Sequence, residues 1–95
     1  METSLGLTYM AMGRPREALA PLRHAVEIHE TAEVDRGDKG NARFTLARAL
    51  WQTGGDRERA LDLPARALED YAASGVLRTK QAAQAEAWLA EKRAR

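Results

Sequence analysis

The 95-residue chain contains no cysteine. A disulfide framework and metal sites with thiolate ligands are therefore excluded. The chain also lacks an apolar run of membrane-spanning length. Its first residues, Met-Glu-Thr-Ser, have neither the basic head nor the apolar stretch of a signal peptide. We therefore expect a cytoplasmic protein with no membrane partner.

The sequence also has no large excess of positive or negative charge, and it has few aromatic side chains. Fifteen basic and fourteen acidic residues give a formal charge of +1, so the sequence lacks the basic face that nucleic-acid binding requires. Aromatic residues make up 5% of the chain and apolar residues 44%, with alanine and leucine most abundant. Such side chains favour helices because they lose little rotamer freedom there. The composition predicts an all-α chain with no nucleic-acid partner.

Two segments of the sequence repeat each other. Leu5 matches Leu46 at a distance of 41 positions, whereas Ala18 matches Ala60 at a distance of 42. The extra residue falls in a turn, where Gly13-Arg14 in the first segment becomes Gly54-Gly55-Asp56 in the second. A fixed period of this size is typical of stacked helix pairs.

Each segment reads as helix, tight turn, helix. Gly13 and Gly54 end the first helix of each pair, and Ser74-Gly75 ends the second helix of the second pair. Pro15 opens a helix at its first turn, and Asp56 is an N-cap candidate. Small side chains at matched positions let the two helices of a pair approach closely: Ala18, Ala25, Ala60 and Ala67. Two prolines fall inside predicted helices, which we expect to be bent but unbroken: Pro21 and Pro64.

These signals predict two antiparallel helix-turn-helix repeats followed by a capping helix. The first repeat occupies residues 1–32 with a truncated start, and a linker covers residues 33–37. The second repeat occupies residues 38–75, with Asp38 capping its first helix. The capping helix lies within residues 76–95, and Trp88 and Leu89 are its large apolar residues. Two repeats are fewer than the three or so that stability usually requires, so we expect a longer parent chain or pairing with a second copy.

The motif Leu5-Gly6-x-x-Tyr9, followed by Ala18-x-x-x-Leu22, resembles the tetratricopeptide repeat. The long period and Pro21 resemble the variety found in kinesin light chains. The second half of the chain also resembles the C-terminal repeats of large bacterial regulators, such as serine/threonine kinases of myxobacterial type. The resemblance implies an α-α superhelix that binds other proteins and uses no cofactor.

In the family that the motif resembles, the first helix of each pair lines a concave groove that takes a peptide or a helix. That resemblance places Thr3, Leu7 and Met10 on the groove in the first repeat. In the second repeat it places there Asn41, Phe44, Thr45, Arg48, Trp51 and Gln52. Independently, spacings of four, three and four put Asn41, Thr45, Arg48 and Gln52 on one helical face. A solvated polar face is the alternative interpretation of this stripe. The carboxylate clamp of some family members is incomplete, because only Asn41 and Arg48 resemble parts of it.

Other candidate sites are weaker. Trp51 and Trp88 are either binding anchors or core residues, and we favour the core for both. His24 and His29 are spaced by five and share no helical face, so no metal pair is predicted. No nucleophile with a matching base and acid is evident, and we expect no enzymatic activity.

The leading hypothesis is a protein-binding module that takes a peptide or a helix. One alternative is self-association, including a homodimer, through an apolar face on the first helix formed by Leu5, Leu7 and Met10. Another alternative is a regulatory tail of a larger signalling protein such as a serine/threonine kinase. The sequence does not identify the partner.

Overall fold

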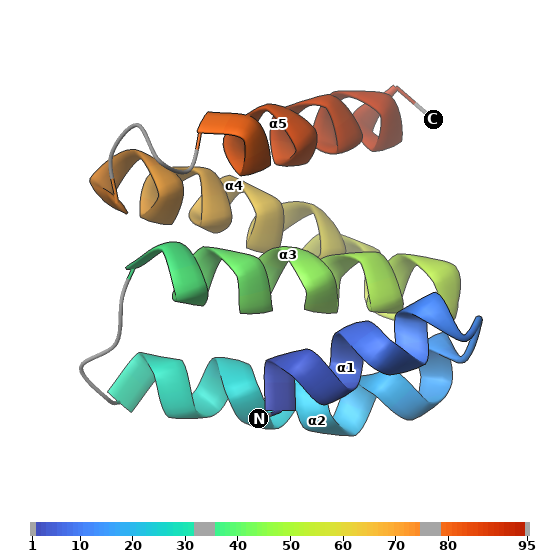
Figure 1. Ribbon diagram of the computed structural model, residues 1–95. Coiled ribbons are helices and arrows are strands. Elements are labelled where there is room, and N and C mark those ends of the chain that lie inside the picture. Colours follow the sequence, from blue (N-terminus) through green and yellow to red (C-terminus); the bar gives the residue numbers. More distant parts are fainter. Residues whose placement is uncertain (1, 32–35, 75–78, 95) are drawn as a thin grey trace.

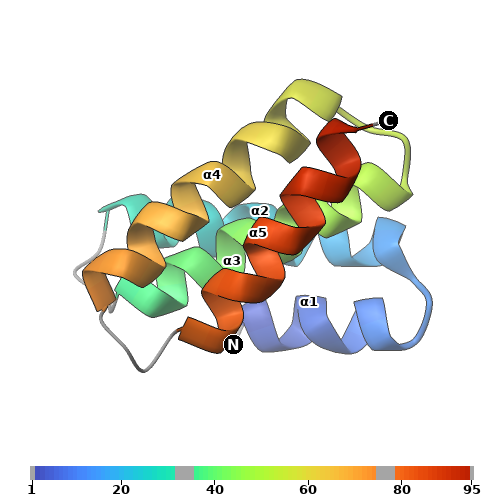
Figure 2. The ribbon, with the colours of Figure 1, turned by 90° about the horizontal axis from the view of Figure 1, so that it is seen from above.

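A computed structural model describes residues 2–31, 36–74 and 79–94 of the chain. Across these ranges it contains five helices and no strand: α1 (Glu2–Ala11), α2 (Pro15–Thr31), α3 (Arg36–Gln52), α4 (Arg57–Ser74) and α5 (Thr79–Arg93). Each helix packs against the next one along the chain, and α1 also touches α3. Figure 1 shows the resulting stack, with the α1–α2 pair at one end and α5 at the other, and Figure 2 shows it from above. The predicted all-α repeat solenoid, two helix pairs plus a last helix, is confirmed.

The two turns inside the helix pairs have the same hydrogen-bond pattern. After α1, the Arg14 amide donates to the Tyr9 carbonyl at 2.8 Å, and after α3 the Gly55 amide donates to the Leu50 carbonyl at 2.8 Å. In both turns a glycine takes a positive φ, 72° at Gly13 and 71° at Gly54. This is the Schellman arrangement that ends a helix, and it favours glycine because a Cβ is strained there.

The extra residue of the second repeat lies where the sequence predicts it. The first backbone bond of α2 runs from the Ala18 amide to the Arg14 carbonyl, and that of α4 runs from the Ala60 amide to the Asp56 carbonyl. The offset between the repeats is therefore 41 residues at the ends of α1 and α3 and 42 residues at the starts of α2 and α4. The Asp56 carboxylate also accepts the Arg59 amide at 3.1 Å, so the predicted N-cap is confirmed.

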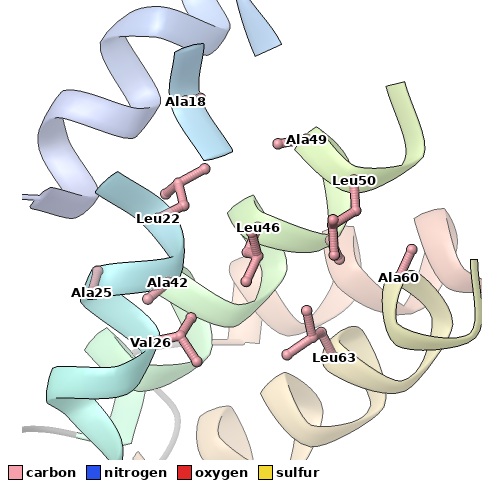
Figure 3. Packing of buried hydrophobic residues seen from close by; sticks show 11 residues of the cluster. Ala18, Leu22, Ala25, Val26, Ala42, Leu46, Ala49, Leu50, Ala60 and Leu63 are labelled. Atoms are coloured by element: carbon pink, nitrogen blue, oxygen red, sulfur yellow. The ribbon is translucent and has the colours of Figure 1, made fainter. Parts of the chain in front are cut away.

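Helix α3 is the centre of the molecule because α2 packs on one side of it and α4 on the other. Figure 3 shows Leu22 and Val26 of α2 facing Leu46, while Leu63 of α4 faces Leu50. All these side chains are buried. The four alanines at matched repeat positions are also buried, as the close approach of paired helices requires.

Glycine allows the tightest helix contacts. A Cβ added at Gly6 would overlap the Leu22 side chain of α2. A Cβ at Gly40 would lie 2.9 Å from the Tyr71 ring and 3.2 Å from the Ala67 carbonyl oxygen. These contacts bring α1 against α2 and α3 against α4 at distances that a larger residue would not permit.

The start of the second repeat differs from the sequence-based prediction. Helix α3 begins at Arg36, so Arg36 and Gly37 belong to its first turn and not to a linker. Asp38 is consequently an acidic residue of the first turn rather than the cap. The remaining linker positions 33–35 lie outside the described residues. Helices α2 and α4 continue through Pro21 and Pro64, as predicted.

A buried carboxylate of α4 binds two arginines of α3, one of them in its first turn. Asp70 of α4 is 1% exposed. Its Oδ1 accepts Arg36 Nε at 2.9 Å, and its Oδ2 accepts Arg43 Nη1 at 2.6 Å. Both arginines belong to the N-terminal half of α3, so this charge-assisted pair of bonds joins that half to the last part of α4.

Candidate functional site

The polar stripe predicted on α3 divides into two parts. Asn41 Oδ1 accepts the Tyr71 hydroxyl of α4 at 2.8 Å. Thr45 is only 4% exposed, and its hydroxyl donates to the Asn41 carbonyl at 2.7 Å. Both side chains thus bond within the molecule; Thr45 is buried, whereas Asn41 is half-buried. Arg48 is half-buried and Gln52 is exposed, and no hydrogen bond within the described residues engages either side chain.

An aromatic cluster lies beside Arg48. Phe44 and Trp51 are seven residues apart, which puts them on the same side of α3. Each of them meets Trp88 of α5 edge to face, with ring centroids 5.8 Å and 5.9 Å apart. All three rings are half-buried, so they pack between the helices and still reach the surface. Trp51 and Trp88 thus pack against the core, as we favoured, and remain partly exposed.

Three cations are held on these rings. The Arg48 guanidinium lies 5.8 Å from the Phe44 centroid, and the Arg57 guanidinium lies 4.5 Å from the Trp51 centroid. Lys92 Nζ lies 5.8 Å from Trp51 and 5.7 Å from Trp88. We call this set the aromatic–cation surface; its members are Phe44, Arg48 and Trp51 of α3, Arg57 of α4, and Trp88 and Lys92 of α5. Cations in such positions are attracted by the ring quadrupole.

Sequence reasoning missed Arg57 and Lys92. Lys92 could have been found, because it follows Trp88 by four residues and so shares its face of α5. Arg57 gives no such signal, since its contact with Trp51 depends on how the turn between α3 and α4 folds back.

The apolar residues predicted for self-association do not behave alike. Leu5 and Leu7 of α1 are 46% and 44% exposed. Met10 is half-buried and packs against the core, so it offers less surface than expected. The side chain of Thr3 lies outside those that the structure describes.

Neither a metal centre nor a membrane segment is found among the described residues. No group of three histidine, cysteine, aspartate or glutamate side chains there could hold a metal ion. None of the helices, over those same residues, combines the length and the apolar character needed to cross a bilayer.

A stack of antiparallel helix pairs defines the class of helical-repeat proteins. The model of the tetratricopeptide repeat family matches residues 1–73, and the chain belongs to this family. No curated protein and no solved structure matches it. Repeats of this family generally mediate protein–protein interactions and are typically non-catalytic.

Proposed function

We propose that this chain is a scaffold module that binds a peptide or a helix of another protein on the aromatic–cation surface, with no catalytic activity of its own. The observation that carries the proposal is the presence of two tryptophans and two arginines at one accessible place on α3, α4 and α5. Tryptophan and arginine are the residues most enriched where binding energy concentrates in interfaces.

The surface has an apolar continuation on α1. With the offset of 41, Leu7 is the repeat equivalent of Arg48, and Met10 is the equivalent of Trp51. Leu7 is 44% exposed, so an extended partner that contacts Arg48 would next meet an apolar side chain on α1. This continuity favours a partner that spans both repeats.

Selection from a random peptide library displayed on phage tests the proposal. The wild-type chain should enrich peptides whose binding is lost in Arg48→Glu and in Leu7→Glu. Arg23→Glu, an equal charge reversal at an exposed position of α2, serves as the control and should keep binding. Circular dichroism verifies that each variant is folded. Equal binding by all three variants would place the binding surface elsewhere.

A second candidate, self-association through α1, rests on a comparison of the two repeats. Leu5 is 46% exposed, whereas its equivalent Leu46 is fully buried beneath α2. Met12, the equivalent of Thr53, is 54% exposed. Helix α2 covers this face on α3, whereas the equivalent face on α1 is exposed. An exposed apolar face favours association. Light scattering over a range of concentrations should show dimers that Leu5→Glu abolishes; a wild-type monomer at high concentration would exclude this candidate.

The cellular setting is also a proposal. A cytoplasmic, bacterial chain that forms the regulatory tail of a larger signalling protein, such as a serine/threonine kinase, is supported by the likeness of the second repeat to such regulators. The long period similarly supports the kinesin-light-chain variety of the repeat. Sequencing the reading frame on both sides of this segment, together with cell fractionation, tests this setting.

A further inference from the structure

The two arginines of the aromatic–cation surface differ from those that hold the fold. Arg36 and Arg43 both bond Asp70, and Arg66 bonds Asp62 at 2.8 Å. Within the described part of the chain, Arg48 and Arg57 have ring contacts but no carboxylate partner. Two positive charges on this surface are therefore left without a counter-charge from these residues.

Two acidic groups near this surface already have partners. The Asp56 carboxylate, next to Arg57 in the sequence, accepts the Arg59 amide at the start of α4. Glu91 lies 3.4 Å from Lys92 and partly neutralises that ammonium group. Lys92 thus adds less positive charge to the surface than Arg48 and Arg57 do.

The ring contacts leave the arginines able to bind. A guanidinium carries five N–H donors in a planar fork and accepts a carboxylate in bidentate fashion. Contact with a ring does not consume these donors as a carboxylate does. It also restricts the side chain, so less conformational entropy is lost when a partner arrives.

From this arrangement we infer that the partner segment is an acidic peptide whose carboxylates pair with Arg48 and Arg57 while an apolar side chain contacts the partly exposed Trp51 and Trp88. The inference rests on the proposed function and names its partner chemistry. Charge complementarity carries it, because carboxylates on a partner would supply the missing counter-charges. A nucleic acid fits less well, since the whole chain carries only +1 and binding to phosphates requires a larger basic face.

Fluorescence anisotropy with defined peptides tests the inference. The probe is a labelled peptide in which glutamate alternates with leucine, and the matched probe has glutamine in place of each glutamate. The glutamate peptide should bind more tightly, and each of Arg48→Gln and Arg57→Gln should weaken it by about tenfold, as expected for one charge-assisted contact. Arg59→Gln is the control, because Arg59 lies in the same first turn of α4 and makes no ring contact.

Salt provides a second measurement. Raising sodium chloride from about 0.1 M to about 1 M shortens the Debye length from about 10 Å to about 3 Å. Binding of the glutamate peptide should therefore weaken strongly, whereas any residual binding of the glutamine peptide should change little.

Three results would overturn the inference. One is equal affinity for the glutamate and glutamine peptides; another is an equal effect of Arg57→Gln and Arg59→Gln; the third is tighter binding of labelled oligothymidine than of the glutamate peptide. The phage library separates this failure from failure of the proposed function. If selected peptides depend on Arg48 and Leu7 but are not enriched in aspartate and glutamate, the proposed function is supported and the acidic partner is wrong. If no peptide is selected, both fail together.

Discussion

Asp70 offers the sharpest test of how the second repeat is held together. Its carboxylate is 1% exposed and bonds two arginines, Arg36 at 2.9 Å and Arg43 at 2.6 Å. In Asp70→Asn the shape is kept, but the charge is lost and an N–H donor of the amide faces the arginine donors. Arg43, with a side chain only 16% exposed, is then left without its counter-charge.

Breaking a buried ion pair by removing one partner costs about 3–5 kcal/mol. The Arg36 side chain is 49% exposed and can be hydrated when its partner is lost, so we expect a smaller destabilisation of about 2–4 kcal/mol. A domain of this length has a total stability of about 5–14 kcal/mol. Asp70→Asn should therefore shift the urea midpoint markedly, as measured by far-ultraviolet circular dichroism at constant m value.

Asp62→Asn is the matched control. Asp62 lies on the same helix and bonds Arg66 at 2.8 Å, but the two side chains are 58% and 59% exposed. The hydrogen bond and charge of Asp62 raise the pKa of Arg66, yet solvent screens a pair of this kind, so its removal should leave the urea midpoint almost unchanged. If Asp70→Asn and Asp62→Asn shift the midpoint equally, burial of the Asp70 carboxylate does not govern its contribution.

A double variant examines the cause of the loss. Replacing both buried partners, as in Asp70→Leu combined with Arg43→Met, removes the unpaired charge and should recover part of the stability lost in Asp70→Asn. A double variant less stable than Asp70→Asn would refute the reasoning, because the loss would then come from packing and not from an uncompensated charge.

Three further predictions concern the fold. Gly6→Ala should destabilise by about 1–3 kcal/mol in urea unfolding, since its Cβ overlaps Leu22; an unchanged midpoint would argue against this close contact. Asp56→Ala should cost about 1 kcal/mol by removing the cap on the Arg59 amide, and Asp56→Asn should restore most of it. Trp88→Ala should cost about 3 kcal/mol and shift the emission of Trp51, its ring neighbour; unaltered emission would contradict that contact.

Local features of the fold follow from the sequence, whereas long-range contacts do not. The sequence predicts the turns at Gly13 and Gly54 and the extra residue before Asp56, because each depends on backbone preferences over a few neighbouring residues. The buried alanines follow from the 41 to 42 residue offset between repeats. Periodicity also places Arg48 and Gln52 on one side of their helix.

Periodicity does not predict which other helix packs against each face of a helix. Only the tertiary structure shows those contacts. Asn41 and Thr45 share the predicted stripe with Arg48, but Tyr71 of α4 engages Asn41 and Thr45 is buried. Asp70 pairs with Arg36 across 34 positions of sequence. A helical pattern carries no information about a contact at such a distance.

What the sequence determined by itself is the set of helices, their turns and the family, since hydrophobic spacing and turn chemistry act within one helix pair. What only the tertiary structure decided is the aromatic–cation surface. Phe44 and Trp51 lie on α3, Trp88 and Lys92 on α5, and Arg57 at the start of α4. Their meeting depends on how three helices stack, because packing geometry sets which side chains reach one another across helices.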